Sequence, residues 1–307
     1  MNTMKKTVLS LALATVAASA QAETVEIELP EFYGKINLTQ EFVQQEDAGS
    51  YSQLNSNASR LGLKGKTAIN DQLTAIYQAE YEIDVDGDGD VFKQRNTFLG
   101  VKGSYGLVQA GVFDTALKAS QGKVDLFNDL PGDIKNVLTH SENREANAVR
   151  YESPSLSGLV VTLDHINAEE EDVNNGLSAS LVYTRDGIYV AYAYDTDVEG
   201  EGIKVQRVTG QLKTSFATFG ALWETEDDNG DSNDGMLFSV SVPVSVVAVN
   251  AQYIASDIKD EGGTQYSLGA EYKLSKKAKT FIFASSSETD EDSSGMDVYG
   301  AGMELKF

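Results

Sequence analysis

The chain has 307 residues and a formal net charge of −23 at pH 7, with 47 acidic residues against 24 lysines and arginines. Such acidity argues against a nucleic-acid partner, because phosphate binding needs clustered positive charge. The absence of cysteine excludes disulfides, thiolate metal sites and thiol catalysis. Hydrogen bonds and packing must therefore hold the fold.

The first residues have the order of a secretory signal peptide. Lys5 and Lys6 precede the apolar stretch VLSLALATVAASA, and Ala20, Gln21 and Ala22 supply a small-residue cleavage pattern. The stretch is too short to span a bilayer as a helix. We expect residues 1–22 to be a cleaved signal peptide and residues 23–307 to form a single domain.

Strict two-residue alternation of apolar and polar side chains runs through the rest of the chain. Neighbouring side chains of a strand point to opposite faces, so the pattern predicts strands with one apolar and one polar face. The candidate strands number sixteen and begin near Phe32, Ser59, Leu73, Lys93, Gly106, Asn147, Leu159, Gly176, Ile188, Gly202, Ala217, Gly235, Val246, Thr264, Ala278 and Gly295.

The connections between these strands alternate in length and charge. Tight turns at Ile69, Ser104 and Arg185 alternate with longer acidic stretches, which begin at Asp84, Glu169, Asp195, Glu224, Asp257 and Glu288. Short turns at one end and long polar loops at the other are typical of outer-membrane barrels. We therefore expect an all-β fold, a transmembrane antiparallel β-barrel of sixteen strands. A soluble β-sandwich or solenoid is the alternative, but it predicts no alternation of loop length.

One connection, residues 114–143, is about thirty residues long and has little strand character. Connections of this length in compact folds are usually functional. A disordered outer loop is the alternative, although Leu126, Phe127, Leu130 and Ile134 give this stretch apolar groups to bury.

Signals for enzymatic chemistry are weak. His140 and His165 are the only histidines, and no nucleophile or phosphate-binding motif is present. DVDGDGD from Asp84 resembles the start of a calcium loop, but Arg95 stands where the ligating glutamate would be. We expect no enzyme activity, no metal site and no cofactor.

Several motifs resemble the general diffusion porins of Gram-negative bacteria. They are FYGKINL at Phe32, SRLGLKGK at Ser59, RNTFLGVKGSYGLVQAG at Arg95, NREANAVRYESPSLSGL at Asn143, and the terminal AGMELKF. The resemblance implies a homotrimer in the outer membrane, in contact with lipid and lipopolysaccharide. It also implies that the long third loop folds into the lumen and that small hydrophilic solutes and ions diffuse passively through a water-filled channel.

By the same resemblance, arginines on the wall face carboxylates on the infolded loop at the narrowest point. The candidate arginines are Arg60, Arg95 and Arg144, and the candidate acids are Asp125, Asp129 and Asp133. The family's glutamate after the loop proline is missing here, because glycine and Asp133 follow Pro131.

The strand phase places two of these arginines differently. Arg60 shares the polar face with Gly62 and Lys64, whereas Arg95 falls in the apolar phase of Leu99. Arg95 must then lie above the apolar band or beyond a β-bulge.

The last strand ends in an apolar face that includes Tyr299 and terminates at Phe307. The resemblance implies that this end is an assembly signal read by the barrel-assembly machinery.

The leading functional hypothesis is a nonspecific pore with a modest preference for cations, because the mouth loops are acidic. A structural or adhesive barrel with a closed lumen is one alternative. A substrate-specific channel is another, although Trp223 is the only tryptophan and no aromatic ladder is legible in the sequence.

Overall fold

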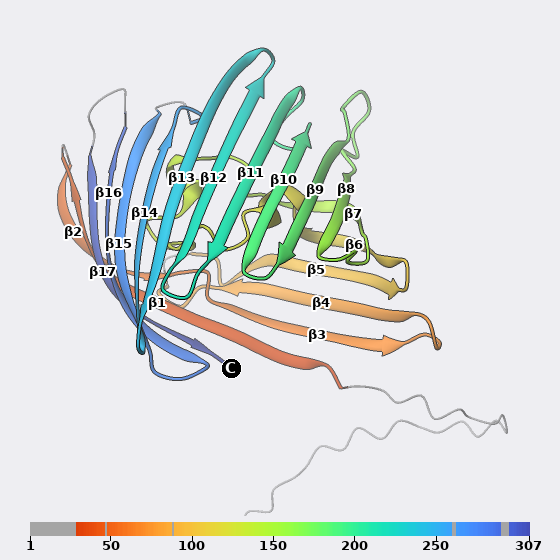
Figure 1. The fold of residues 1–307 in the computed structure, drawn as a ribbon, viewed down its shortest axis with the longest axis horizontal. Coiled ribbons are helices and arrows are strands. Elements are labelled where there is room, and N and C mark those ends of the chain that lie inside the picture. Colours follow the sequence, from red (N-terminus) through yellow and green to blue (C-terminus); the bar gives the residue numbers. More distant parts are fainter. Residues whose placement is uncertain (1–28, 47, 88, 260–261, 290–294) are drawn as a thin grey trace, which may run out of the picture.

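A closed antiparallel barrel forms the body of the computed structural model, which describes residues 29–46, 48–87, 89–259, 262–289 and 295–307 (Figure 1). The expected signal peptide, residues 1–22, lies outside the described residues. The strands are β1 (Glu31–Gln45), β2 (Gly49–Ser56), β3 (Arg60–Ala68), β4 (Thr74–Ile83), β5 (Phe92–Gly103), β6 (Gly106–Asp114), β7 (Arg144–Glu152), β8 (Leu159–Ile166), β9 (Gly176–Arg185), β10 (Ile188–Thr196), β11 (Ile203–Lys213), β12 (Thr218–Asp228), β13 (Asp231–Val244), β14 (Val247–Ser256), β15 (Gly263–Lys273), β16 (Ala278–Glu288) and β17 (Met296–Lys306). Two short helices, α1 (Ala116–Ser120) and α2 (Ile134–Val137), lie between β6 and β7.

These segments make sixteen barrel strands, as the alternation predicts. β2 and β3 both pair with β1, β2 along its later half and β3 along its earlier half, so together they form one barrel strand. The break falls at Ala58, whose φ of 47° departs from strand geometry. β1 also pairs with β17, which closes the sheet and leaves no free edge among the strands described. The prediction that this second strand begins near Ser59 is wrong by about ten residues, because it begins at Gly49.

The acidic stretch from Glu224 is a second departure from the sequence prediction. It is a continuous hairpin, in which β12 and β13 pair from Asp228 opposite Asp231 to Thr218 opposite Ser241. Asn229 and Gly230 form the turn, both with positive φ (53° and 110°), which is the backbone that a tight hairpin turn requires. The acidic side chains of this stretch therefore belong to paired strands and not to a loop.

The barrel is apolar outside and polar inside. On β15, Tyr266, Leu268 and Tyr272 are exposed on the outer face, whereas Gln265 and Ser267 are buried on the inner face. This arrangement explains how a chain with a mean hydropathy of −0.27 presents an apolar belt to lipid. Within the described ranges, no helix has the length and apolar character needed to cross a bilayer.

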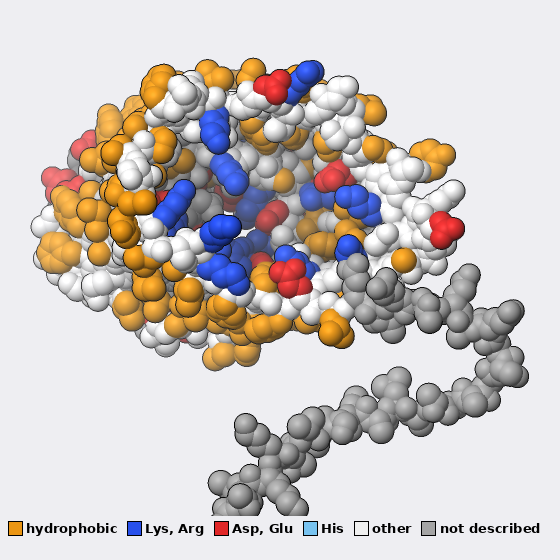
Figure 2. Space-filling view, turned by 60° about the horizontal axis from the view of Figure 1, so that its bottom comes forward, with side chains coloured by type: hydrophobic (Ala, Val, Ile, Leu, Met, Phe, Trp, Pro, Cys, Tyr) orange, Lys and Arg blue, Asp and Glu red, His pale blue; other side chains and the backbone are white. Residues whose placement is uncertain are grey.

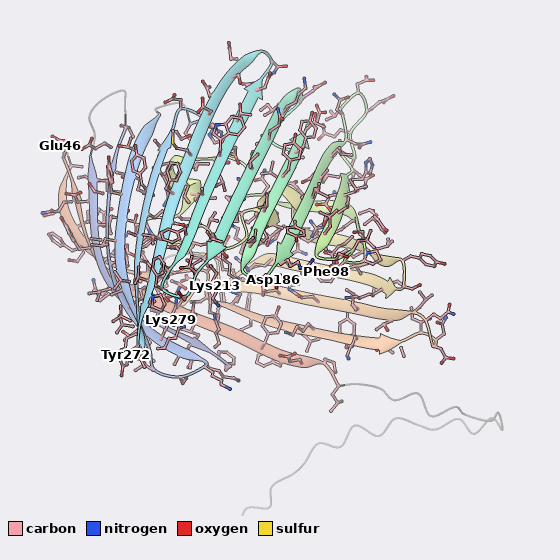
Figure 3. All side chains as sticks on the ribbon, in the orientation of Figure 1. Glu46, Phe98, Asp186, Lys213, Tyr272 and Lys279 are labelled. Atoms are coloured by element: carbon pink, nitrogen blue, oxygen red, sulfur yellow. The ribbon has the colours of Figure 1, made fainter. Side chains whose placement is uncertain are left out.

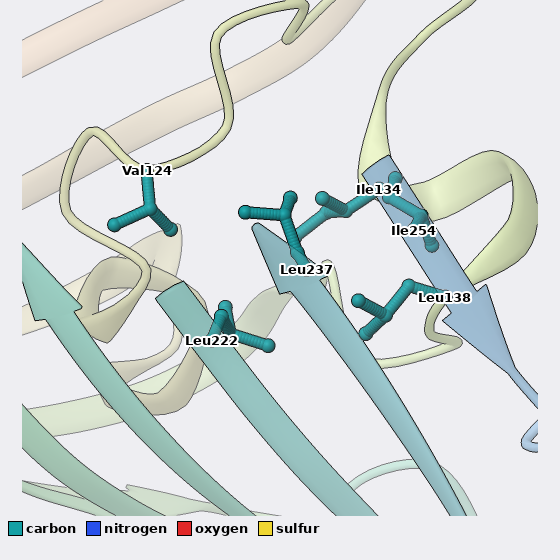
Figure 4. Packing of buried hydrophobic residues seen from close by; sticks show 6 residues of the cluster. All are labelled: Val124, Ile134, Leu138, Leu222, Leu237 and Ile254. Atoms are coloured by element: carbon teal, nitrogen blue, oxygen red, sulfur yellow. The ribbon is translucent and has the colours of Figure 1, made fainter. Parts of the chain in front are cut away.

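Residues 115–143, called the inner segment below, lie against the inner wall of the barrel. Val124, Ile134 and Leu138 of this segment pack on three wall residues (Figure 4), which are Leu222, Leu237 and Ile254. All six are almost fully buried, and burying side chains of this size stabilises by roughly 1.5–3 kcal/mol each. The packing therefore fixes the inner segment to the β12–β14 side of the barrel.

Hydrogen bonds from wall side chains satisfy the backbone of the inner segment. Ser239 donates to the Val124 carbonyl (2.6 Å), and Ser256 donates to the Leu138 carbonyl (2.8 Å). A Cβ added at Gly220 would lie 3.0 Å from Val124 Cβ, so glycine there allows the close approach. A second apolar contact joins Phe127 to Phe281 and Phe283 of β16.

Candidate functional site

A polar cavity of about 600 Å³ lies between the inner segment and the opposite wall of the barrel. Its lining comes from strands β2 to β7, from the connections after β2 and β4, and from the inner segment. The charged lining residues are Arg60, Glu82, Asp86, Lys93, Arg95, Asp114, Lys118, Asp129, Asp133, Lys135, Glu142 and Arg144. The cavity is thus bordered by closely spaced charges of both signs.

Arg60 faces the tip of the inner segment. Its guanidinium lies 3.7 Å from the Asp129 carboxylate, and Lys35 of β1 holds the same carboxylate oxygen at 3.0 Å. Burial opposes ionisation of Asp129, but Lys35 and Arg60 outweigh it and hold the pKa of this carboxyl below its usual value. Asp129 also has a φ of 65°, a backbone conformation that aspartate tolerates better than most residues. The ion pairs of Asp129 with Lys35 and Arg60 therefore connect the inner segment to the barrel wall.

Arg95 reaches the lumen through a β-bulge. The register between β4 and β5 shifts so that Arg95 and Asn96 together oppose the single residue Glu80. The shift turns Arg95 from the apolar phase of its strand to the inner face. There it donates to Glu80 (2.8 Å) and Glu82 (2.7 Å) of β4.

Arg144, at the start of β7, belongs to a second group beside the first. It lies 2.8 Å from Asp114 and donates to the Asn96 side chain at 2.6 Å. Lys118 of α1 approaches the same Asp114 carboxylate at 3.5 Å. The bulge residues Arg95 and Asn96 thus link the group around Glu80 to the group around Asp114.

The three candidate acids of the inner segment have different surroundings. Asp129 alone forms ion pairs with wall cations. Asp133 is buried at the start of α2 and accepts from the backbone amides of Asp129 (2.8 Å) and Lys135 (2.9 Å). Asp125 accepts from the Phe127 and Ile134 amides and from the Gln252 side chain.

Asp125 therefore stands apart from the arginine cluster that the sequence assigned it to face. Among the described residues it makes no ion pair with Arg60, Arg95 or Arg144, and it does not line the cavity. Burial, followed by the nearby Asp133, raises the pKa of Asp125 to about 7. Its contacts are those of a residue that shapes the inner segment.

Arg207 of β11 anchors both ends of the inner segment to the wall. Its fully buried guanidinium contacts Glu224 of β12 at 2.5 Å and Glu142 of the segment at 3.0 Å. It also donates to the Leu117 carbonyl at 3.3 Å, near the segment's beginning. One side chain thus holds the start and the end of the segment in place.

Sequence reasoning missed several of these charges. Lys35, Asp114 and Arg207 were not singled out, although each occupies a polar position beside predicted strand residues. Glu80 and Glu82 alternate with the apolar residues of their strand, and that phase is the signal that identifies them as partners for a lumenal arginine. The contacts of Lys35, Asp114 and Arg207 could not be predicted without knowing which distant strands pair.

The two residues proposed as the assembly signal lie on the outer surface. Tyr299 of β17 is exposed and pairs in register with Phe42 of β1. Phe307 exchanges backbone hydrogen bonds with Gly34, both at 3.1 Å. A Cβ at Gly34 would lie 2.4 Å from the Phe307 ring, so this ring covers the glycine.

A closed sixteen-stranded barrel with an apolar outer belt, a polar interior and an inner segment beside a charged cavity defines a channel of the outer-membrane type. A model of the Gram-negative porin family matches residues 9–292, and the chain belongs to this family. It is located in the outer membrane.

Relatives and solved structures resemble this chain over nearly its whole length. The major outer membrane protein P.IB of Neisseria lactamica is 24% identical over 92% of this chain and 93% of its own length. The anion-selective porin from Comamonas acidovorans superposes with a TM-score of 0.75 at 18% identity, covering 91% of this chain and 99% of the porin. The trimer form of OmpT from Vibrio cholerae gives a TM-score of 0.71 at 18% identity, covering 91% and 99% of the two chains.

Proposed function

We propose that the channel passes small hydrophilic solutes and ions by passive diffusion, sorted by size and by charge. The observation that carries this proposal is the polar cavity of about 600 Å³ between the inner segment and the arginine-bearing wall. Fixed charges of both signs there favour polar solutes over apolar ones, because an apolar solute would have to displace water from charged groups.

Liposome swelling tests this proposal. Liposomes containing the purified protein should swell in isotonic solutions of small sugars, at rates that fall steadily as the sugar grows. A substrate-specific channel would instead show one sugar that saturates, and a closed adhesive barrel would show no swelling at all. Either outcome would rule out a general diffusion pore.

We also propose a modest preference for cations. Acidic residues dominate the loop end of the barrel and attract cations within a Debye length of about 8–10 Å at physiological salt. Arg60, Arg95 and Arg144 oppose this attraction at the cavity. The anion-selective porin from Comamonas acidovorans has a similar fold, so the fold itself does not fix selectivity.

Four further proposals concern partners. We propose a homotrimer, supported by the trimer form of the Vibrio cholerae neighbour. The apolar outer belt supports contact with membrane lipid, and the acidic outer loops support contact with lipopolysaccharide through divalent cations. The exposed aromatic end at Tyr299 and Phe307 supports recognition by the barrel-assembly machinery. Nothing in the site requires catalysis, and we propose no enzymatic role.

A further inference from the structure

The two ends of the barrel carry opposite charge. The end that bears the longer connections, called the loop end, is strongly acidic. Its described acids are Glu46, Asp84, Asp86, Asp90, Glu169, Glu170, Glu171, Asp172, Asp197, Glu199, Glu201, Asp227, Asp228, Asp231, Asp234, Asp257 and Glu288. The described basic residues at this end are few, namely Lys93, Lys135, Lys204 and Lys259.

The opposite end, called the turn end, is lined by lysines that point into the lumen. Strand pairing fixes their direction, because each shares the phase of buried lumenal residues on its strand. The inward lysines are Lys64, Lys66, Lys102, Lys213, Lys273, Lys279 and Lys306. Figure 2 looks toward this end and shows lysine and arginine side chains around the hollow of the barrel. Figure 3 shows Lys213 and Lys279 there, far from Glu46 at the loop end.

Carboxylates offset only part of the turn-end charge. Lys279 pairs with Glu271, Lys306 lies 3.1 Å from Glu304, and Lys64 lies 3.4 Å from Glu31. The inward lysines still outnumber the inward acids at this end, which are Glu31, Glu152, Glu271 and Glu304. The turn between β15 and β16 adds further lysines, and a cavity of about 510 Å³ there is lined mainly by lysine side chains.

We propose that this axial separation of charge makes the pore a rectifier, which passes more current when the loop end is at positive potential than when it is negative. The proposal rests on the proposed function, an open water-filled pore. The acidic end enriches cations and the basic end enriches anions. A field directed from the loop end to the turn end drives both enriched populations toward the middle of the pore, which raises conductance. The reverse field depletes the middle of ions.

Salt concentration sets the size of the effect. At ~0.01 M salt the Debye length is about 30 Å, so the fixed charge at each end controls the whole cross-section of the lumen. At ~1 M salt it is about 3 Å, and mobile ions screen the walls. We expect the current at the favoured polarity to exceed the other by about two-fold or more at the lower salt, and the two to become equal at the higher salt.

The experiment is a single-channel current–voltage curve with the orientation of the inserted protein known. Because the native chain has no cysteine, Asn174→Cys in an outer loop supplies a unique thiol. A charged, membrane-impermeant thiol reagent added to one compartment changes the current only if the loops face that compartment. All rectification ratios are then referred to the loop end.

Two matched double variants separate the ends. Lys213→Gln with Lys273→Gln should lower the rectification ratio toward one, whereas Lys204→Gln with Lys259→Gln, the same charge change at the loop end, should leave it equal or higher. Glu169→Gln, Glu170→Gln and Glu171→Gln together should also lower it, which provides a second test if the lysine variant does not fold. Symmetric wild-type current at ~0.01 M salt would overturn the rectifier but leave the open pore standing. Absence of any current would instead overturn the proposed function.

Discussion

Arg207 and Glu224 are both fully buried, and their ion pair is the most enclosed charge contact described inside the barrel. Removing one partner of such a pair leaves a buried charge uncompensated, which typically costs about 3–5 kcal/mol. Loss of Arg207 would weaken the attachment of the inner segment to the wall, because Arg207 also donates to Glu142 and to the Leu117 carbonyl.

Arg207→Gln should therefore loosen the inner segment while the barrel stays closed. We expect noisier open-channel current and closure at lower voltage, measured by single-channel recording, with the folded barrel still resistant to detergent. Lys279→Gln is the control, because its pair with Glu271 is partly exposed and worth about 0–1 kcal/mol. Channel noise equal to wild type would contradict the anchoring role.

Asp125 gives a pH dependence with a defined sign. Its pKa is raised from 3.8 to about 7, so between those values the folded chain binds a proton that the unfolded chain does not. The wild type thus loses stability as pH rises through this window. Asp125→Asn abolishes the titration, and its unfolding temperature relative to wild type should increase from pH 5 to pH 8. Heat-induced loss of the folded band on detergent gels measures it, and a difference that does not change with pH would refute the assignment.

At the residue level the sequence was informative where strand phase was sufficient. Arg60 was correctly placed on the inner face because its strand is regular. Asp125 and Asp133 could not be told apart from Asp129, since their roles depend on how a segment without periodicity folds. Arg207 was missed because its partners, Glu142 and Leu117, are 65 and 90 residues away in the chain.

Among the elements, β5 shows why phase alone is insufficient. The alternation predicted that Arg95 lies either above the apolar band or beyond a β-bulge, and the structure has a bulge opposite Glu80. β2 escaped prediction because its sequence, GSYSQLNS, has little apolar alternation. The Asn229–Gly230 turn was hidden in an acidic run whose composition resembles a loop, although an Asn-Gly pair is a hairpin signal.

The contact between β1 and Phe307, called the join below, provides a test at the element scale. Deleting Phe307 should reduce outer-membrane insertion and leave protease-sensitive periplasmic protein, because the residue supplies both backbone hydrogen bonds to Gly34 and the ring over it. Gly34→Ala should weaken the same join through a clash with that ring.

Gly210→Ala is the matched control for the join, since a Cβ there meets nothing within 4 Å. Fractionation of cells followed by protease digestion measures insertion of all three variants. Normal insertion of the Phe307 deletion at ordinary expression levels would count against an assembly signal.

For the whole molecule, closure of β1 on β17 leaves an apolar outer belt and, among the described strands, no edge for association. We therefore expect subunits to associate side by side through their outer faces. Sedimentation of the purified protein in detergent, corrected for bound detergent, should give a mass of three chains, and heating should be needed to separate them. A monodisperse single chain would exclude the homotrimer.

The central claim is that a charged constriction in a water-filled pore controls which ions pass. The arginines and Asp129 contribute opposite charge to one cavity, so their removal should move selectivity in opposite directions. Arg185→Gln, on an exposed turn, changes the same kind of charge far from the cavity and serves as the control.

The reversal potential under a salt gradient measures this selectivity directly. Wild type should prefer cations modestly, Arg60→Gln with Arg144→Gln should strengthen that preference, and Asp129→Asn should shift it toward anions. Both shifts should shrink as salt rises, since the Debye length falls from about 30 Å at ~0.01 M to about 3 Å at ~1 M. If both variants keep the reversal potential of wild type and of the Arg185→Gln control, these residues do not line the conducting path and the account is contradicted.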